Sequence, residues 1–144
     1  MMCGKQVRSL LRAGVLLCTA VAVHAVSDPD SAPRKLTLNE ARELANQPAS
    51  AHGPVDLTES PRPLDRVFYY LAATWRNPTG SPVAGYYAVN PWTGDVWDVS
   101  GCKRLDSETL RKRRDAIRRE SGVSRSAFAR LRNRKPLCIW PDDR

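Results

Sequence analysis

Side chains that commonly carry out chemistry are scarce in this chain of 144 residues. The histidines are His24 and His52, and the cysteines are Cys3, Cys18, Cys102 and Cys138. A catalytic histidine or thiolate needs a partner group that activates or orients it. No G-x-S-x-G, H-E-x-x-H, P-loop or glycine-rich nucleotide motif occurs, and no C-x-x-C spacing suggests zinc. We therefore expect no cofactor, no metal and no enzymatic activity.

The first 25 residues have the order of a secretory signal peptide. Lys5, Arg8 and Arg12 precede an apolar run over 13–23, and Ala25 stands just before a polar segment. This arrangement predicts cleavage after Ala25 and a periplasmic or secreted protein. A membrane-spanning helix needs about 20 apolar residues, so an uncleaved anchor is the weaker alternative.

Cleavage would change which groups remain for chemistry. His24 leaves with the signal, and so do two of the four cysteines. In an oxidising compartment the remaining pair, Cys102 and Cys138, is expected to form a disulfide, with two free buried thiols as the alternative. His52 is then the last histidine, and a hydrolase would need a nucleophile brought against it.

The remaining sequence predicts a flexible lead-in over 26–36 and one small α+β domain over 37–144. Thr37 and Glu40 form a capping box, which predicts a helix over 38–46 that ends before Pro48. The proline-rich segment 47–63 is expected to be a loop.

A three-stranded antiparallel meander is expected next. The segment 66–76 fits either a helical stripe or a strand, and its aromatic and β-branched residues favour the strand. A second strand covers 84–90, and a tight turn at 90–95 leads into the third. With Asn90 opposite Asp95, the residues that share one apolar face are Tyr86, Ala88, Trp97 and Val99.

The C-terminal third is expected to be helical and is strongly basic. Ser107 or Asp106 can cap one helix that Gly122 ends, and Ser124 can cap a second that Pro136 stops. Residues 103–144 hold fourteen basic and six acidic residues. Such a surface would suit nucleic acid in the cytosol, but export makes that partner unlikely and directs attention to protein, lipid or polysaccharide.

The segment 87–96, Y-A-V-N-P-W-T-G-D-V, resembles the central hairpin of PepSY-type domains, which are small exported modules. The helix before the meander is similar too. The resemblance implies a binding module of the kind associated with protease inhibition or envelope regulation.

Two surfaces are therefore candidates for contact with a partner. One is the turn, with Trp92, Thr93 and Asp95, where Trp92 is either an exposed anchor or folded back onto the sheet. The other is the basic helix, whose candidate residues are Arg111, Arg114, Arg118 and Arg119. The first hypothesis is an inhibitor or immunity-type protein acting by surface contact on an envelope enzyme or toxin. The alternative is an envelope protein whose basic helix binds anionic lipid or polysaccharide, or whose basic face is merely solvated.

Overall fold

The computed structural model describes residues 34–60 and 64–138. The expected signal peptide and most of the expected lead-in lie outside these residues. Within the described part of the chain, no helix has the length and apolar character needed to cross a membrane. The elements in chain order are α1 (Leu38–Ala49), η1 (Ser50–His52), β1 (Val55–Glu59), β2 (Tyr69–Trp75), β3 (Val83–Val89), β4 (Val96–Asp98), β5 (Lys103–Arg104), α2 (Glu108–Glu120) and α3 (Arg125–Arg132).

The strands form one antiparallel sheet in the order β1-β2-β3-β4-β5. The expected α+β class is confirmed, but the prediction of three strands is wrong, because the sheet has five strands in the described residues. β1 lies inside the segment expected to be a loop and pairs Val55 with Trp75. β5 is only two residues long. Both are edge strands with mostly exposed side chains, so they depend on pairing with a neighbour more than on their own sequence.

The central hairpin has the predicted register. Val89 pairs with Val96, and Ala88 pairs with Trp97. The segment 66–76, which fitted either a helix or a strand, is confirmed as a strand, since β2 occupies 69–75. Tyr86, Ala88, Trp97 and Val99 lie in one apolar cluster, as the alternation of strand side chains requires.

Helix α1 begins where the capping box places it. The Thr37 hydroxyl accepts from the Glu40 N–H, and the Glu40 carboxylate accepts from the Thr37 N–H. The expected end before Pro48 is wrong, because the helix continues through Pro48 to Ala49. A proline in the last turn removes one backbone donor. The Ser50 hydroxyl donates to the Asn46 carbonyl at 2.7 Å and closes this end of the helix.

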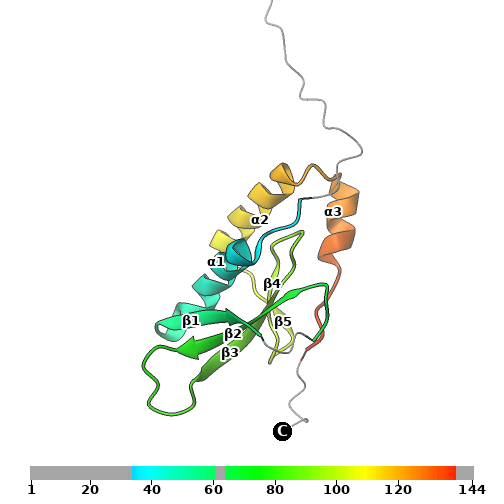
Figure 1. Ribbon diagram of the computed structural model, residues 1–144. Coiled ribbons are helices and arrows are strands. Elements are labelled where there is room, and N and C mark those ends of the chain that lie inside the picture. Colours follow the sequence, from blue (N-terminus) through cyan, green and yellow to red (C-terminus); the bar gives the residue numbers. More distant parts are fainter. Residues whose placement is uncertain (1–33, 61–63, 139–144) are drawn as a thin grey trace, which may run out of the picture.

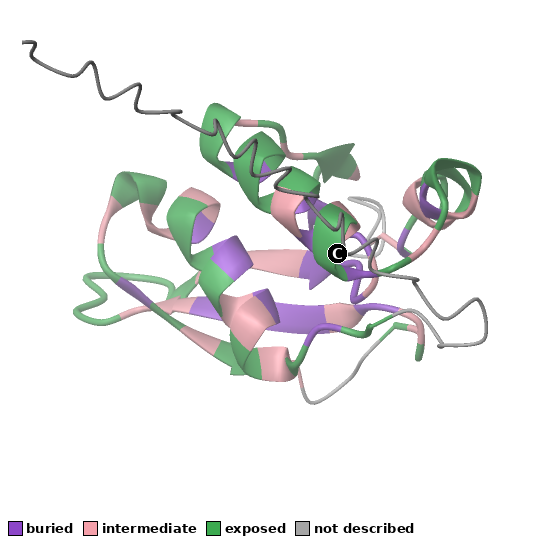
Figure 2. Cartoon of the chain, turned by 90° about the horizontal axis from the view of Figure 1, so that it is seen from above, coloured by how far each residue is buried: buried purple, intermediate pink, exposed green. Residues whose placement is uncertain are grey.

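The main core lies between the sheet and the helices. α1 and α2 run along the same side of the sheet, and α3 stands apart from them beyond β4 (Figure 1). Buried residues follow the strands and the inward sides of the helices, whereas the outward sides are exposed (Figure 2). The core cluster consists of Leu36, Ala41, Leu44, Ala45, Leu71, Val89, Val96, Leu110, Ile117 and Phe128.

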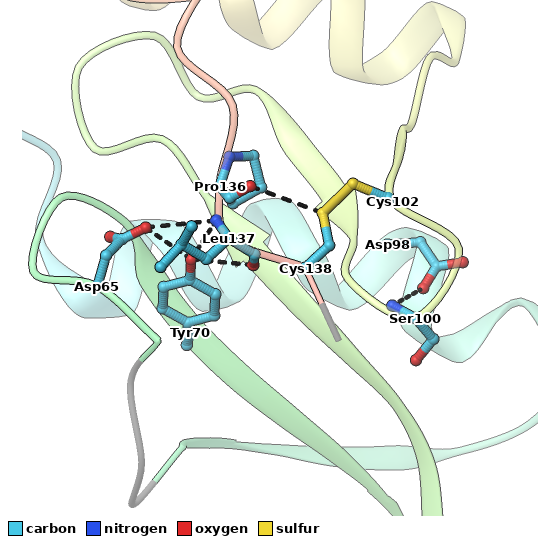
Figure 3. The surroundings of a disulfide bond; sticks show 8 residues. All are labelled: Asp65, Tyr70, Asp98, Ser100, Cys102, Pro136, Leu137 and Cys138. Carbon is cyan, nitrogen blue, oxygen red and sulfur yellow. Dashed lines mark hydrogen bonds between the residues drawn. A yellow bond between two sulfur atoms is a disulfide. The ribbon is translucent and has the colours of Figure 1, made fainter. Parts of the chain in front are cut away.

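The predicted disulfide between Cys102 and Cys138 is present, and it holds the segment that follows α3. Beside it, the Tyr70 hydroxyl donates to Asp65 at 2.7 Å and accepts from the Leu137 N–H at 3.0 Å (Figure 3). Partial burial opposes ionisation of Asp65, but hydrogen bonds from Phe68 N–H and Tyr70 hold its pKa below the ordinary value. Burial, followed by the Asp65 hydrogen bond, raises the pKa of Tyr70. The C-terminal segment is thus fixed by a covalent bond and a hydrogen-bond network.

Candidate functional site

The turn between β3 and β4 is closed by its own backbone. The Asn90 N–H donates to the Asp95 carbonyl and the Gly94 N–H donates to the Asn90 carbonyl, both at 2.9 Å. Gly94 has a φ of +69°, a conformation that a residue with a side chain rarely adopts. The Asn90 side chain donates to the Leu131 carbonyl at 3.0 Å and connects the turn to α3. The turn is therefore part of the interior rather than a free tip.

Thr93 and Asp95, two of the predicted contact residues, are completely buried. The Thr93 hydroxyl donates to Asp95 Oδ2 at 2.9 Å. A partner at the surface cannot reach either side chain in this conformation. The structure places both residues where they hold the turn and present a negative charge to the helices behind it.

Arg114 forms an ion pair with the carboxylate of Asp95. Its side chain is 7% exposed, and its Nη1 lies 3.5 Å from Asp95 Oδ1. Its Nη2 donates to Asp106 Oδ1. The hydrogen bond from Arg114 is the main reason that the pKa of Asp106 is lowered. A buried arginine needs such carboxylates to offset its lost hydration.

Arg132 approaches the same carboxylate from α3. Its Nε lies 3.5 Å from Asp95 Oδ1, and its side chain is 40% exposed. Asp95 thus lies between arginines of two different helices. This shared carboxylate ties α2 and α3 to one turn and fixes the space between the two helices.

That space is an open groove of about 370 Å³, which we name the Arg groove. Its lining residues are Asp106, Arg111, Arg114, Asp115, Arg118, Arg125, Phe128, Ala129 and Arg132. Positive side chains outnumber negative ones among them. Phe128 is buried and gives the groove an apolar floor.

Two arginines of the groove form no ion pair within the described part of the chain. Arg118 and Arg125 make no ion pair or hydrogen bond through their side chains with the residues that the structure describes. Arg111 lies 3.4 Å from Asp106 and stays 60% exposed. The groove therefore offers guanidinium groups that are not engaged in ion pairs, and such groups bind carboxylate and phosphate through paired hydrogen bonds.

The structure brings three of the four predicted helix residues together and leaves one apart. Arg111, Arg114 and Arg118 line the groove, whereas Arg119 is exposed outside it. Arg125 and Arg132 were missed by the sequence analysis. A signal was present, because both helices repeat one spacing: 111, 114, 115 and 118 on α2, and 125, 128, 129 and 132 on α3. Residues at i, i+3, i+4 and i+7 share a helix face.

Trp92 is half-buried and lies between two cations. The Lys35 ammonium and the Arg134 guanidinium each lie 5.8 Å from the centroid of its ring. Lys35 also lies 5.2 Å from the ring centroid of Tyr69. Cation–π contacts of this kind link the residue before α1 to the segment after α3 across the turn. The Trp92 indole therefore makes contacts within the protein, and part of its surface remains exposed to solvent.

His52 is exposed at the end of η1, and no described residue hydrogen-bonds to its imidazole. No side chain in 34–60 or 64–138 therefore orients it as a general base. Within the same ranges, no three histidine, cysteine, aspartate or glutamate residues gather as a metal site would require.

The comparisons with known proteins give one likeness in fold. No family model matches the chain, so the PepSY resemblance stays a prediction, and no curated protein matches it in sequence. A chain of a solved type VI secretion system effector–immunity complex from Pseudomonas protegens is similar, with a TM-score of 0.52 and 22% identity. The match covers 68% of this chain and 87% of that chain, and at this identity it shows a shared fold.

Proposed function

We propose that this protein is an exported inhibitor or immunity-type protein that neutralises a protein partner by surface contact, and that the Arg groove is the contact surface. The observation that carries the proposal is the pair Arg118 and Arg125, which line one groove and form no ion pair with the described residues. The likeness in fold to a chain of an effector–immunity complex supports the same class of function.

The shape and charge of the groove favour a protein partner with an exposed acidic loop. Carboxylates on such a loop would pair with Arg118 and Arg125, and its apolar side chains would meet Phe128 on the floor. Because Arg114 and Arg132 are already held by Asp95, the groove needs little rearrangement to bind. Preorganisation of this kind raises affinity, since fewer side chains must be ordered on binding.

Binding of α2 to a lipid surface is less well supported. A membrane would contact the outward face of the helix, where neighbouring acids offset several of the basic side chains. Lys112 lies 2.7 Å from Glu108, and Arg113 lies 3.4 Å from Glu43. Five arginines line the concave Arg groove, and a concave surface fits a protruding loop better than a flat bilayer.

The test is capture of partners from envelope extract by the tagged protein at low and moderate salt. We expect the wild type to retain a toxin or hydrolase and the double variant Arg118→Glu/Arg125→Glu to lose it. The matched control is Arg119→Glu/Arg130→Glu, which makes the same change in charge at exposed positions outside the groove. Equal loss in both double variants would show that only net charge matters and would overturn the assignment of the groove.

A second arm uses vesicles that contain phosphatidylglycerol. The alternative function predicts that they bind the wild type, that salt weakens this binding steeply, and that no envelope protein is retained. That combined result would replace the inhibitor hypothesis with the lipid-binding one.

A further inference from the structure

A second hollow lies at the other end of the sheet from the turn that supports the Arg groove. It has a volume of about 530 Å³ and lies between η1 and the loop that joins β2 to β3. The lining residues are His52, Gly53, Pro54, Trp75, Asn77, Pro78, Thr79, Gly80 and Ser81. Its size falls within the usual range for sites that bind small molecules.

Trp75 is the aromatic wall of this hollow, and the backbone around it is fixed. It is the last residue of β2, pairs with Val55, and donates its N–H to the Pro82 carbonyl at 2.8 Å. A Cβ on Gly53 would stand only 3.1 Å from a carbon of the indole ring. The glycine therefore lets the chain pass close to the ring, so that Trp75 is held in place by its neighbours.

The polar side chains of the hollow have no hydrogen-bond partner within the described residues. The side chains of His52, Asn77, Thr79 and Ser81 make no hydrogen bond with any residue in the described part of the chain. The Trp75 indole N–H likewise makes no hydrogen bond with the described residues. Elsewhere in this fold, comparable side chains cap helices or close turns, as Ser107 and Asn90 do.

Among the described residues, no aspartate, glutamate, lysine or arginine lines the hollow. An aromatic plane surrounded by hydroxyl, amide and imidazole groups suits a ligand with one apolar face and a rim of hydroxyls. Neutral sugars have this form, since the C–H face of the ring can stack on indole while the hydroxyls exchange hydrogen bonds with the rim. We propose that this hollow, the Trp75 pocket, binds a neutral saccharide.

The inference does not depend on the proposed function, because the two sites lie on different elements. Titration of the isotope-labelled exported protein with an N-acetylglucosamine trisaccharide, maltotriose and trigalacturonic acid tests it by NMR. We expect a saturable shift of the Trp75 indole N–H signal with at least one of the two neutral sugars. The Trp75→Phe variant, which lacks this signal, identifies it among the four tryptophans.

The double variant Asn77→Ala/Thr79→Ala should weaken binding of the neutral sugar by about tenfold or more, because it removes two side chains that can each form a hydrogen bond. Both residues are exposed in a loop, so the variant is expected to fold as the wild type does. Arg118→Glu/Arg125→Glu should bind the sugar unchanged even if it loses its protein partner. The proposal is overturned if neither neutral sugar moves the Trp75 signal, if Asn77→Ala/Thr79→Ala binds as the wild type does, or if only trigalacturonic acid binds.

Discussion

Arg114 Nη1 on α2 lies 3.5 Å from Asp95 Oδ1 in the β3–β4 turn, with both side chains almost completely buried. This pair joins the β3–β4 hairpin to α2, the predicted basic helix. It also explains why a turn that first suggests an exposed binding tip lies inside the protein. Asp95 forms its ion pairs inside the protein. It influences the surface by positioning Arg114 and Arg132, which line the Arg groove.

Replacement of Arg114 by Ala should leave the buried Asp95 with the more exposed Arg132 as its one ion-pair partner among the described residues. Breaking a buried ion pair by removing one partner costs about 3 kcal/mol or more. Arg118→Ala, on the same helix and without an ion pair in the described residues, should change stability by less than about 0.5 kcal/mol. Urea unfolding of both variants measures the difference. Equal midpoints would show that the Asp95–Arg114 pair contributes little to the fold.

Gly94 and Gly122 offer a matched pair of substitutions. Both have positive φ, +69° and +70°, so alanine is strained by about 1 kcal/mol at either position. At Gly94 the added methyl group would also overlap Ile117 and press on Leu44, whereas Gly122 has open space around it. We therefore expect Gly94→Ala to cost about 3 kcal/mol in total and Gly122→Ala about 1 kcal/mol. Thermal unfolding of the two variants checks this, and similar losses would contradict the close packing of the turn against α2.

Asp65 should make stability depend on pH. Because its pKa is lowered in the folded protein, its contribution is present above the ordinary carboxyl pKa of about 4 and is lost as the pH falls through the folded value. Asp65→Asn should therefore be less stable than the wild type at about pH 6, with a smaller difference at about pH 3. Tyr70→Phe removes one donor to Asp65 and should show part of the same effect. A difference that stays constant with pH would exclude this linkage.

Removal of the disulfide by Cys102→Ser/Cys138→Ser should lower the free energy of unfolding by about 3–4 kcal/mol, since the bond closes a loop with a sequence separation of 36. Chemical denaturation with and without a reducing agent measures this. The wild type should lose stability on reduction, and the double variant should not respond. If reduction does not change the stability of the wild type, the segment around Leu137 that follows α3 is held by its hydrogen bonds alone.

The sequence predicts the central hairpin well because its information is local. Pro91 and Gly94 determine the turn, and side chains alternating along the strands then determine the register, so the pairing of Ala88 with Trp97 follows. The caps at Ser107 and Ser124 are local signals too, and both are confirmed.

The features that the sequence does not predict depend on contacts between segments that are distant in the chain. β1 alternates apolar and polar residues over 55–58, but the prolines around it favour a loop, and its pairing with the edge of β2 is a contact between distant segments. The surroundings of Trp92 come from Lys35 and Arg134, which the chain separates widely. The Arg groove combines one face of α2 with one face of α3, and these faces meet through long-range contacts such as those of Arg114 and Arg132 with Asp95.

The ring closed by Cys102 and Cys138 contains the whole of α2 and α3, and with them both walls of the Arg groove. Oxidation therefore limits how far the two walls can separate before any partner arrives. A chain kept with free thiols would have to order this surface during binding and would bind more weakly even while folded. If the Arg groove is the contact surface, as we propose, chains that have passed through an oxidising compartment should therefore hold a partner more tightly than chains that have not.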